Sequence, residues 1–124
     1  MPPERIILSG IWVSTMLIYL LGDVLRLFSG DVTPGEMAGE VAKPWMWTVA
    51  ALIMLVPIVM VVLSLVVPYP AVRWLTVGVA VAAVLFNLAG LPYKGFYDNM
   101  LIVVSFAFNG AAVWVAMTWT PPLE

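Results

Sequence analysis

The chain has 124 residues, of which 64% are hydrophobic and only 10% are charged, and its mean hydropathy is +1.08. A soluble domain of this size could not bury so much apolar surface, so the composition indicates an integral membrane protein. The net charge of −2 without a basic cluster excludes a nucleic-acid interface, and the absence of Cys and His excludes thiol nucleophiles, imidazole-ligated haem and His or Cys zinc sites. We therefore expect neither a metal nor a cofactor.

Four apolar runs predict four transmembrane helices, over residues 6–28, 45–67, 74–91 and 100–119. One span takes about 20 residues, so four spans nearly fill a single domain over residues 1–124. Turn-forming Pro and Gly separate the runs, and Trp and Tyr cluster at their ends, where amphipathic rings favour the headgroup layer. The expected fold is an all-α bundle of four transmembrane helices.

The first apolar run carries the sharpest pattern. At 100° per residue, its polar, small and aromatic residues fall within roughly 140° of arc, while the opposite side is aliphatic. These residues are Ser9, Trp12, Thr15, Met16, Tyr19, Gly22, Asp23 and Arg26. One face of this helix is therefore predicted to contact protein and the other face to contact lipid.

The loop after the first run carries its own helix signal. Thr33, Pro34 and Glu36 match a helix start, with a hydroxyl cap, a proline at the first position and an acid three residues after the cap. This pattern predicts a short amphipathic helix over residues 33–43, lying on the membrane surface. The alternative is a solvated loop with one helical turn.

The other three runs carry small and polar residues at helical spacing, and ordinary helix packing explains most of them. Pro57 lies near the middle of its run and predicts a kink. Ser105 and Asn109 belong to the stripe on the fourth run. Asn109 is expected near the midplane, where Thr15 or a carbonyl freed by Pro57 could bind its amide.

Asp23 and Arg26 are two charges inside an apolar run. Asp23 lies roughly 10 Å from the bilayer centre at 1.5 Å per residue, toward the side of the first and third loops. A polar cluster is predicted on this side, with Asp23, Arg26 and Asn87 as inner members beside Tyr19 and Trp12. Its outer members, at or beyond the hydrocarbon edge, are Tyr93, Tyr97 and Asp98.

Two interpretations of this cluster remain open. In the first, Asp23 pairs with Arg26 one turn on, Arg26 reaches the headgroups, and the pair anchors the helix end. In the second, the charges mark a functional site, because a charged group within a span is costly. The position near the surface favours the anchor, whereas the stripe shared with Trp12 and Tyr19 favours the site.

The first run also resembles the opening of a family of small bacterial four-helix membrane proteins of unknown function, which read L-S-x-x-W, M-x-x-Y and D-V-L. The matching positions are Leu8, Ser9, Trp12, Met16, Tyr19, Asp23, Val24 and Leu25. The family's P-I-x-M-V-L-L-S and N-R-W segments resemble stretches that contain Pro57, Ser64, Arg73 and Trp74. The resemblance covers most of the first 75 residues, implies a four-helix fold in a bacterial membrane, and supplies no activity.

Three functional classes make different demands on these residues. A proton-coupled transporter needs a carboxylate deep in the first helix, and Asp23 is displaced toward one surface. An enzyme needs a nucleophile and a base in reach of each other, and the available constellation is Tyr19, Asp23 and Asn87 with Asp98 or Lys94. Ser105 stands where the resemblance leads us to expect an acid, which weighs against a two-carboxylate mechanism.

The third class needs the fewest special residues, and we favour it: a structural or accessory subunit, or a binder of lipid or another hydrophobic ligand. A transporter that uses Asp23 is the alternative. We expect the chain in the lipid bilayer of a bacterial plasma membrane, with both termini in the cytoplasm. The small-residue stripes offer more packing surface than one bundle needs, so a homo-oligomer is expected, with a dimer favoured.

Overall fold

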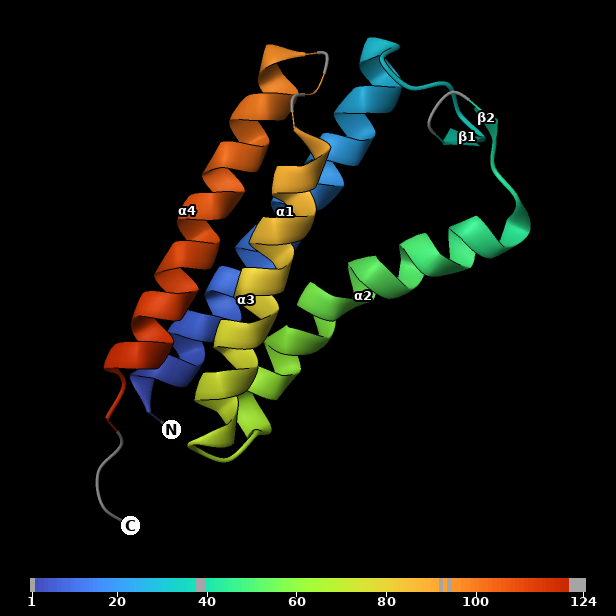
Figure 1. Ribbon diagram of the computed structural model, residues 1–124. Helices are drawn as coiled ribbons and strands as arrows, with labels where there is room; N and C mark the ends of the chain where they lie inside the picture. Colours follow the sequence, from blue (N-terminus) through green and yellow to red (C-terminus); the bar gives the residue numbers. More distant parts are fainter. Residues whose placement is uncertain (1, 38–39, 92, 94, 121–124) are drawn as a thin grey trace.

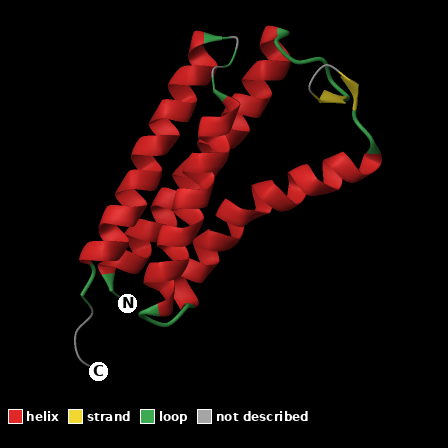
Figure 2. Cartoon of the chain, viewed as in Figure 1, coloured by secondary structure: helices red, strands yellow, loops and turns green. Residues whose placement is uncertain are grey.

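The computed structural model describes residues 2–37, 40–91, 93 and 95–120. Within them the chain forms four long helices and one short hairpin (Figures 1 and 2): α1 (Pro3–Ser29), β1 (Glu36–Met37), β2 (Glu40–Val41), α2 (Pro44–Val66), α3 (Ala71–Gly90) and α4 (Phe96–Thr118). All four helices are long and apolar enough to cross a membrane. The predicted all-α membrane bundle is confirmed, and the chain is a multi-pass membrane protein.

Local chemistry explains where the helices begin and end. Proline occupies the start of α1 at Pro3 and of α2 at Pro44, where a missing N–H costs no helical hydrogen bond. Gly30 ends α1 at φ 82°, a left-handed conformation that suits glycine. α4 begins at Phe96, earlier than the apolar run indicated, so that Asp98 lies in its first turn.

The prediction of a short helix over residues 33–43 is wrong. β1 and β2 pair antiparallel, with Glu36 opposite Val41, and the Ala42 N–H donates to the Gly35 carbonyl at 3.0 Å. Gly35 has φ 87°, and a left-handed residue at this point turns the chain out of a helical path. The rest of the expected helix, residues 38–39, lies outside the described residues.

A cluster of buried apolar residues fills the bundle at the end where α1 begins and α4 ends, which we call the terminal end. α1 packs along α2 and α4, and α3 packs along α4, whereas α2 and α3 share a much smaller contact (Figure 1). The core at this end joins all the helices except α2; its buried members are Leu8, Val72, Ala112, Val115 and Trp119. A second core cluster of Trp12, Met60 and Ala80 joins α1, α2 and α3.

α2 bends away from the other helices. Figure 1 shows its N-terminal half diverging from α1 and α3, while its C-terminal half stays in the bundle. Pro57 lies inside α2 and is buried. A proline within a helix removes one backbone hydrogen bond and crowds the preceding turn, which accounts for the bend. The bundle is therefore open between α2 and α3 on the loop side.

Candidate functional site

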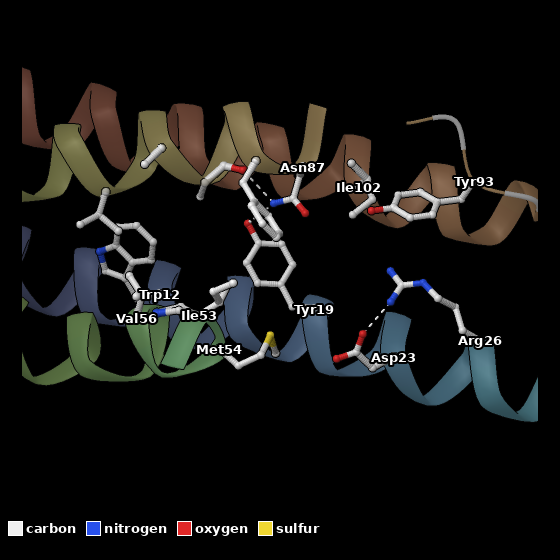
Figure 3. Close-up of a pocket in the computed structure, with 15 residues that line it drawn as sticks. Trp12, Tyr19, Asp23, Arg26, Ile53, Met54, Val56, Asn87, Tyr93 and Ile102 are labelled. Carbon is white, nitrogen blue, oxygen red and sulfur yellow. Dashed lines mark hydrogen bonds and ion pairs between the residues drawn. The ribbon is translucent and has the colours of Figure 1, made fainter. Parts of the chain in front are cut away.

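A groove of about 360 Å³ lies where α2 leaves the bundle. Its walls come from α1, α2 and α3, with Tyr93 from the loop after α3 and one residue from α4, Ile102 (Figure 3). Most of the lining is apolar and includes Ile53, Met54, Val79 and Phe86. The polar lining residues are Trp12, Tyr19, Asp23, Arg26, Asn87 and Tyr93, all of which belong to the cluster predicted from the sequence.

Arg26 organises the loop-side end of the groove. Its Nε and Nη2 donate to the Asp98 carboxylate at 2.7 and 2.9 Å, and its Nη1 donates to Asp23 Oδ1 at 2.6 Å. The Asp98 side chain is 3% exposed and that of Asp23 is 51% exposed. A two-pronged arginine–carboxylate contact is among the stronger ion pairs, so Arg26 and Asp98 tie α1 to α4 at this end.

Two neighbouring residues shape the space around Arg26. The Tyr93 ring lies 5.0 Å from the guanidinium carbon and provides a cation–π contact. A Cβ added at Gly22 would lie 3.2 Å from Arg26 Nη2 and 3.9 Å from Asp98 Oδ1. Glycine at this position therefore leaves room for the guanidinium between the two helices.

A second polar group lies deeper, around the Tyr19 hydroxyl. The Asn87 amide donates to it at 3.0 Å and the Asn109 amide at 3.3 Å, so α3 and α4 both reach α1 through one oxygen. Asn109 also donates to the Ser105 carbonyl at 3.0 Å. The partners expected for Asn109 were therefore wrong: Thr15 donates to its own helix, at the Ile11 carbonyl.

Other predicted residues lie apart from this contact network. The Tyr97 hydroxyl donates to Asp31 at 2.6 Å and contacts Ser29 Oγ at 2.8 Å, which links α4 to the end of α1 outside the groove. The Ser105 hydroxyl donates within α4 to the Ile102 carbonyl at 2.6 Å. Lys94, a candidate for an enzymatic constellation, lies outside the described residues.

Asp98 is the residue whose burial the sequence analysis missed. It was expected at or beyond the hydrocarbon edge, and it is buried against Arg26. A signal was present in the sequence, because Asp98 continues the buried stripe of α4 at spacings of three and four residues. That stripe is Asp98, Ile102, Ser105, Asn109, Ala112 and Ala116.

The sequence analysis also missed the arginines of the terminal end. Arg5 donates to the Ser64 and Val67 carbonyls at 3.2 and 2.8 Å, and Arg73 donates to the Ala116 carbonyl at 2.9 Å and to that of Trp119. These carbonyls end α2 and α4, where a helix leaves acceptors without backbone partners. Both arginines therefore act as helix caps.

The geometry of the groove supports ligand binding better than catalysis. Asp23, which lines the groove, and the buried Asp98 both hold Arg26, and the rest of the lining is apolar or aromatic except for the Asn87 amide. Among the described residues, no group of three or more His, Cys, Asp or Glu side chains could hold a metal ion. The groove instead offers an apolar volume that ends in a polar cluster. Comparisons with models of protein families, with curated proteins and with solved structures find no match to this chain.

Proposed function

We propose that this protein binds a lipid or another hydrophobic ligand in the groove between α1, α2 and α3. The observation that carries the proposal is the groove itself, whose volume of about 360 Å³ lies within the range typical of small-molecule sites, roughly 300–1,000 Å³. Its lining combines a long apolar wall with a few polar groups at one end. That combination fits an amphiphile, with its chain on the wall and its head at Asp23 and Arg26.

The placement of the groove in the membrane supports the same function. The polar end lies toward the loops, where the length of α1 leads us to expect the boundary of headgroups and hydrocarbon, and the apolar part is expected to continue toward the bilayer centre. The groove lies on the side where α2 bends away from α3 (Figure 1), so we expect a lipid chain to enter it from the bilayer. Along α1 the lining runs from Trp12 to Arg26, about 21 Å at 1.5 Å per residue.

A transporter that uses Asp23 is the second candidate, because Asp23 lines the groove and is half exposed. A transport path must also reach the opposite surface. The terminal end of the bundle is filled by Leu8, Val72 and Ala112, all fully buried, and by Trp119 at 2% exposure. A filled core at one end and a groove at the other support a binding protein over a transporter.

We also propose that the protein is a homodimer with cytoplasmic termini, in a bacterial plasma membrane as the resemblance of its first helices to a small four-helix family implies. Three helical glycines support close approach of a second copy: a Cβ at Gly10, Gly78 or Gly110 would meet nothing within 4 Å in this chain. Glycine within a helix costs about 0.5–1 kcal/mol relative to alanine, and the packing of one copy does not require it here. Small exposed residues let membrane helices pack closely against a partner.

The test is native mass spectrometry of the protein released from a mild detergent. We expect two copies of the chain and a retained lipid or other hydrophobic molecule. Ala83→Leu fills the groove and should remove the retained molecule, whereas Ala89→Leu, on the same helix but outside the groove lining, should leave it in place. Equal retention by the two variants would contradict the proposed binding site, and a monomer would contradict the dimer.

A further inference from the structure

We infer that the groove selects amphiphiles whose head is a positively charged hydrogen-bond donor, of the primary ammonium class. This inference rests on the proposed ligand-binding function and adds the chemistry of the head. Three features of the loop-side end carry it: an excess of negative charge, an amide oxygen that accepts no hydrogen bond from the described residues, and aromatic rings in the same lining.

The first feature is the charge balance at Arg26. Asp23, Arg26 and Asp98 form one group of ion pairs at the polar end of the groove and together carry a net charge of −1. The buried Asp98 is matched by Arg26 through two hydrogen bonds. The excess charge therefore resides on Asp23, the exposed member, which lines the groove. Only its Oδ1 contacts Arg26, and Figure 3 shows its other oxygen turned away from that residue.

The second feature is the carbonyl oxygen of Asn87. The amide nitrogen of this residue donates to the Ala83 carbonyl at 2.8 Å and to the Tyr19 hydroxyl at 3.0 Å. A backbone carbonyl only accepts, so the nitrogen must face Ala83 and the amide orientation is fixed. Asn87 is 8% exposed and lines the groove, and its oxygen accepts no hydrogen bond from the described residues. Figure 3 shows this oxygen on the side of the amide that faces Arg26 and Tyr93.

The third feature is the aromatic lining. Tyr19 and Tyr93 both line the polar end, and the Tyr93 ring already lies 5.0 Å from the Arg26 guanidinium carbon, so the Tyr19 ring is the aromatic group left to attract a second cation. An anionic head would be less well bound at this end. Three Arg26 N–H groups already donate to the carboxylates of Asp98 and Asp23, and Asp23 would repel a negative charge. An ammonium group at this end would have a carboxylate, an amide acceptor and an aromatic ring among the residues that line the groove.

The first experiment compares three dodecyl compounds by native mass spectrometry in a non-ionic detergent: dodecylammonium, dodecanol and dodecanoate. We expect one bound dodecylammonium per chain, held at least about ten-fold more tightly than either other compound, because only it gains an attraction of opposite charges. Equal binding of all three compounds, or tighter binding of dodecanoate, would overturn the inference about the head.

Variants separate this inference from the proposed function. Asp23→Asn should abolish the preference for dodecylammonium over dodecanol, because the negative charge is lost. Ala83→Leu should weaken binding of all three compounds. If Ala83→Leu has no effect on any of them, the groove itself is not the ligand site and the proposed function fails. If Ala83→Leu weakens binding but Asp23→Asn keeps the ammonium preference, only the inference about the head fails.

Asp31→Asn is the matched control. Like Asp23→Asn, it removes one acid on the loop side, so the two variants have the same net charge. Asp31, however, contacts Tyr97 and does not line the groove. The Asp31→Asn variant should keep the preference for dodecylammonium. Loss of the preference in this variant would show that net charge alone sets it and would overturn the inference. Thermal unfolding of each variant confirms that the bundle is intact.

A last experiment tests whether the bound ammonium group belongs to a membrane lipid or to a free lipophilic amine. The protein is released from lipid nanodiscs that contain equal amounts of phosphatidylethanolamine and phosphatidylglycerol. Enrichment of phosphatidylethanolamine in the wild type, lost in Asp23→Asn, assigns the site to a membrane lipid. Dodecylammonium binding without this enrichment assigns it to a free lipophilic amine. Enrichment of phosphatidylglycerol overturns the inference.

Discussion

The two ends of the bundle use arginine in opposite ways. At the terminal end, Arg5 and Arg73 donate to backbone carbonyls that end α2 and α4, and the aromatic rings of Trp119 and Tyr69 lie against them. At the loop end, Arg26 also meets an aromatic ring, Tyr93, but its donors go to two carboxylates. The terminal arginines therefore close a packed core, whereas Arg26 leaves a half-exposed charge beside an open groove.

This difference shows how one bundle separates stability from binding. Carbonyl caps satisfy acceptors that every helix must satisfy, and the Tyr69 and Trp119 rings, with centroids 5.3 Å apart, pack the same end. The ion pairs at the loop end hold α1 on α4 but leave α2 free to diverge. Substitutions at the two ends should therefore have different consequences for unfolding and for ligand binding.

The largest effect is expected from Arg26→Met. The substitution leaves the buried Asp98 without a counter-charge, and breaking a buried ion pair in this way costs about 3–5 kcal/mol of the free energy of unfolding. Equilibrium unfolding of the detergent-solubilised protein measures the loss. Adding Asp98→Asn to the variant should recover much of it; no recovery would show that Arg26 contributes through packing instead of through charge.

A smaller effect is expected from Arg73→Met at the terminal end. The substitution keeps an apolar stem but leaves the Ala116 and Trp119 carbonyls without this donor, which costs about 1–3 kcal/mol for a buried acceptor. The groove is remote from this site, so the retained ligand should stay. Loss of the ligand at unchanged stability would break the proposed separation of the two ends.

Pro57→Ala tests the opening of the groove. Restoring the backbone N–H should straighten α2 and bring its N-terminal half toward α3, which narrows the groove and reduces ligand retention. Because the chain has no cysteine, spin labels can be introduced at Val49 and Leu88, and double electron–electron resonance reports their separation. A shorter distance is expected in the variant; an unchanged distance would mean that the bend does not depend on the proline.

The smallest effect on stability is expected from Asp23→Asn. The Asp23 side chain is 51% exposed, and ion pairs of exposed side chains contribute about 0–1 kcal/mol. Equilibrium unfolding should therefore differ little from that of the wild type, although the ammonium preference is lost. A destabilisation as large as that of Arg26→Met would favour the anchor interpretation, in which Asp23 mainly secures the end of α1.

The sequence alone was sufficient for the features that depend on one helix at a time. Four apolar runs of spanning length predict four transmembrane helices, because a backbone in hydrocarbon must satisfy its own hydrogen bonds. Helical periodicity likewise places Trp12, Tyr19, Asp23 and Arg26 on one face of α1, and three-dimensional packing agrees, since all four line the groove. These predictions need only the rise and turn of an α-helix.

Only the tertiary structure decided which residues of the other helices these side chains contact. Arg26 meets Asp98, and Tyr19 meets Asn87 and Asn109, across separations of 68 to 90 residues along the chain. The same applies to the open side of the bundle, because the bend of α2 leaves a groove only if no other helix fills it. Such contacts depend on how the helices pack and rotate against one another. Helical periodicity predicts which face of a helix is buried, but it does not predict which helix packs against that face.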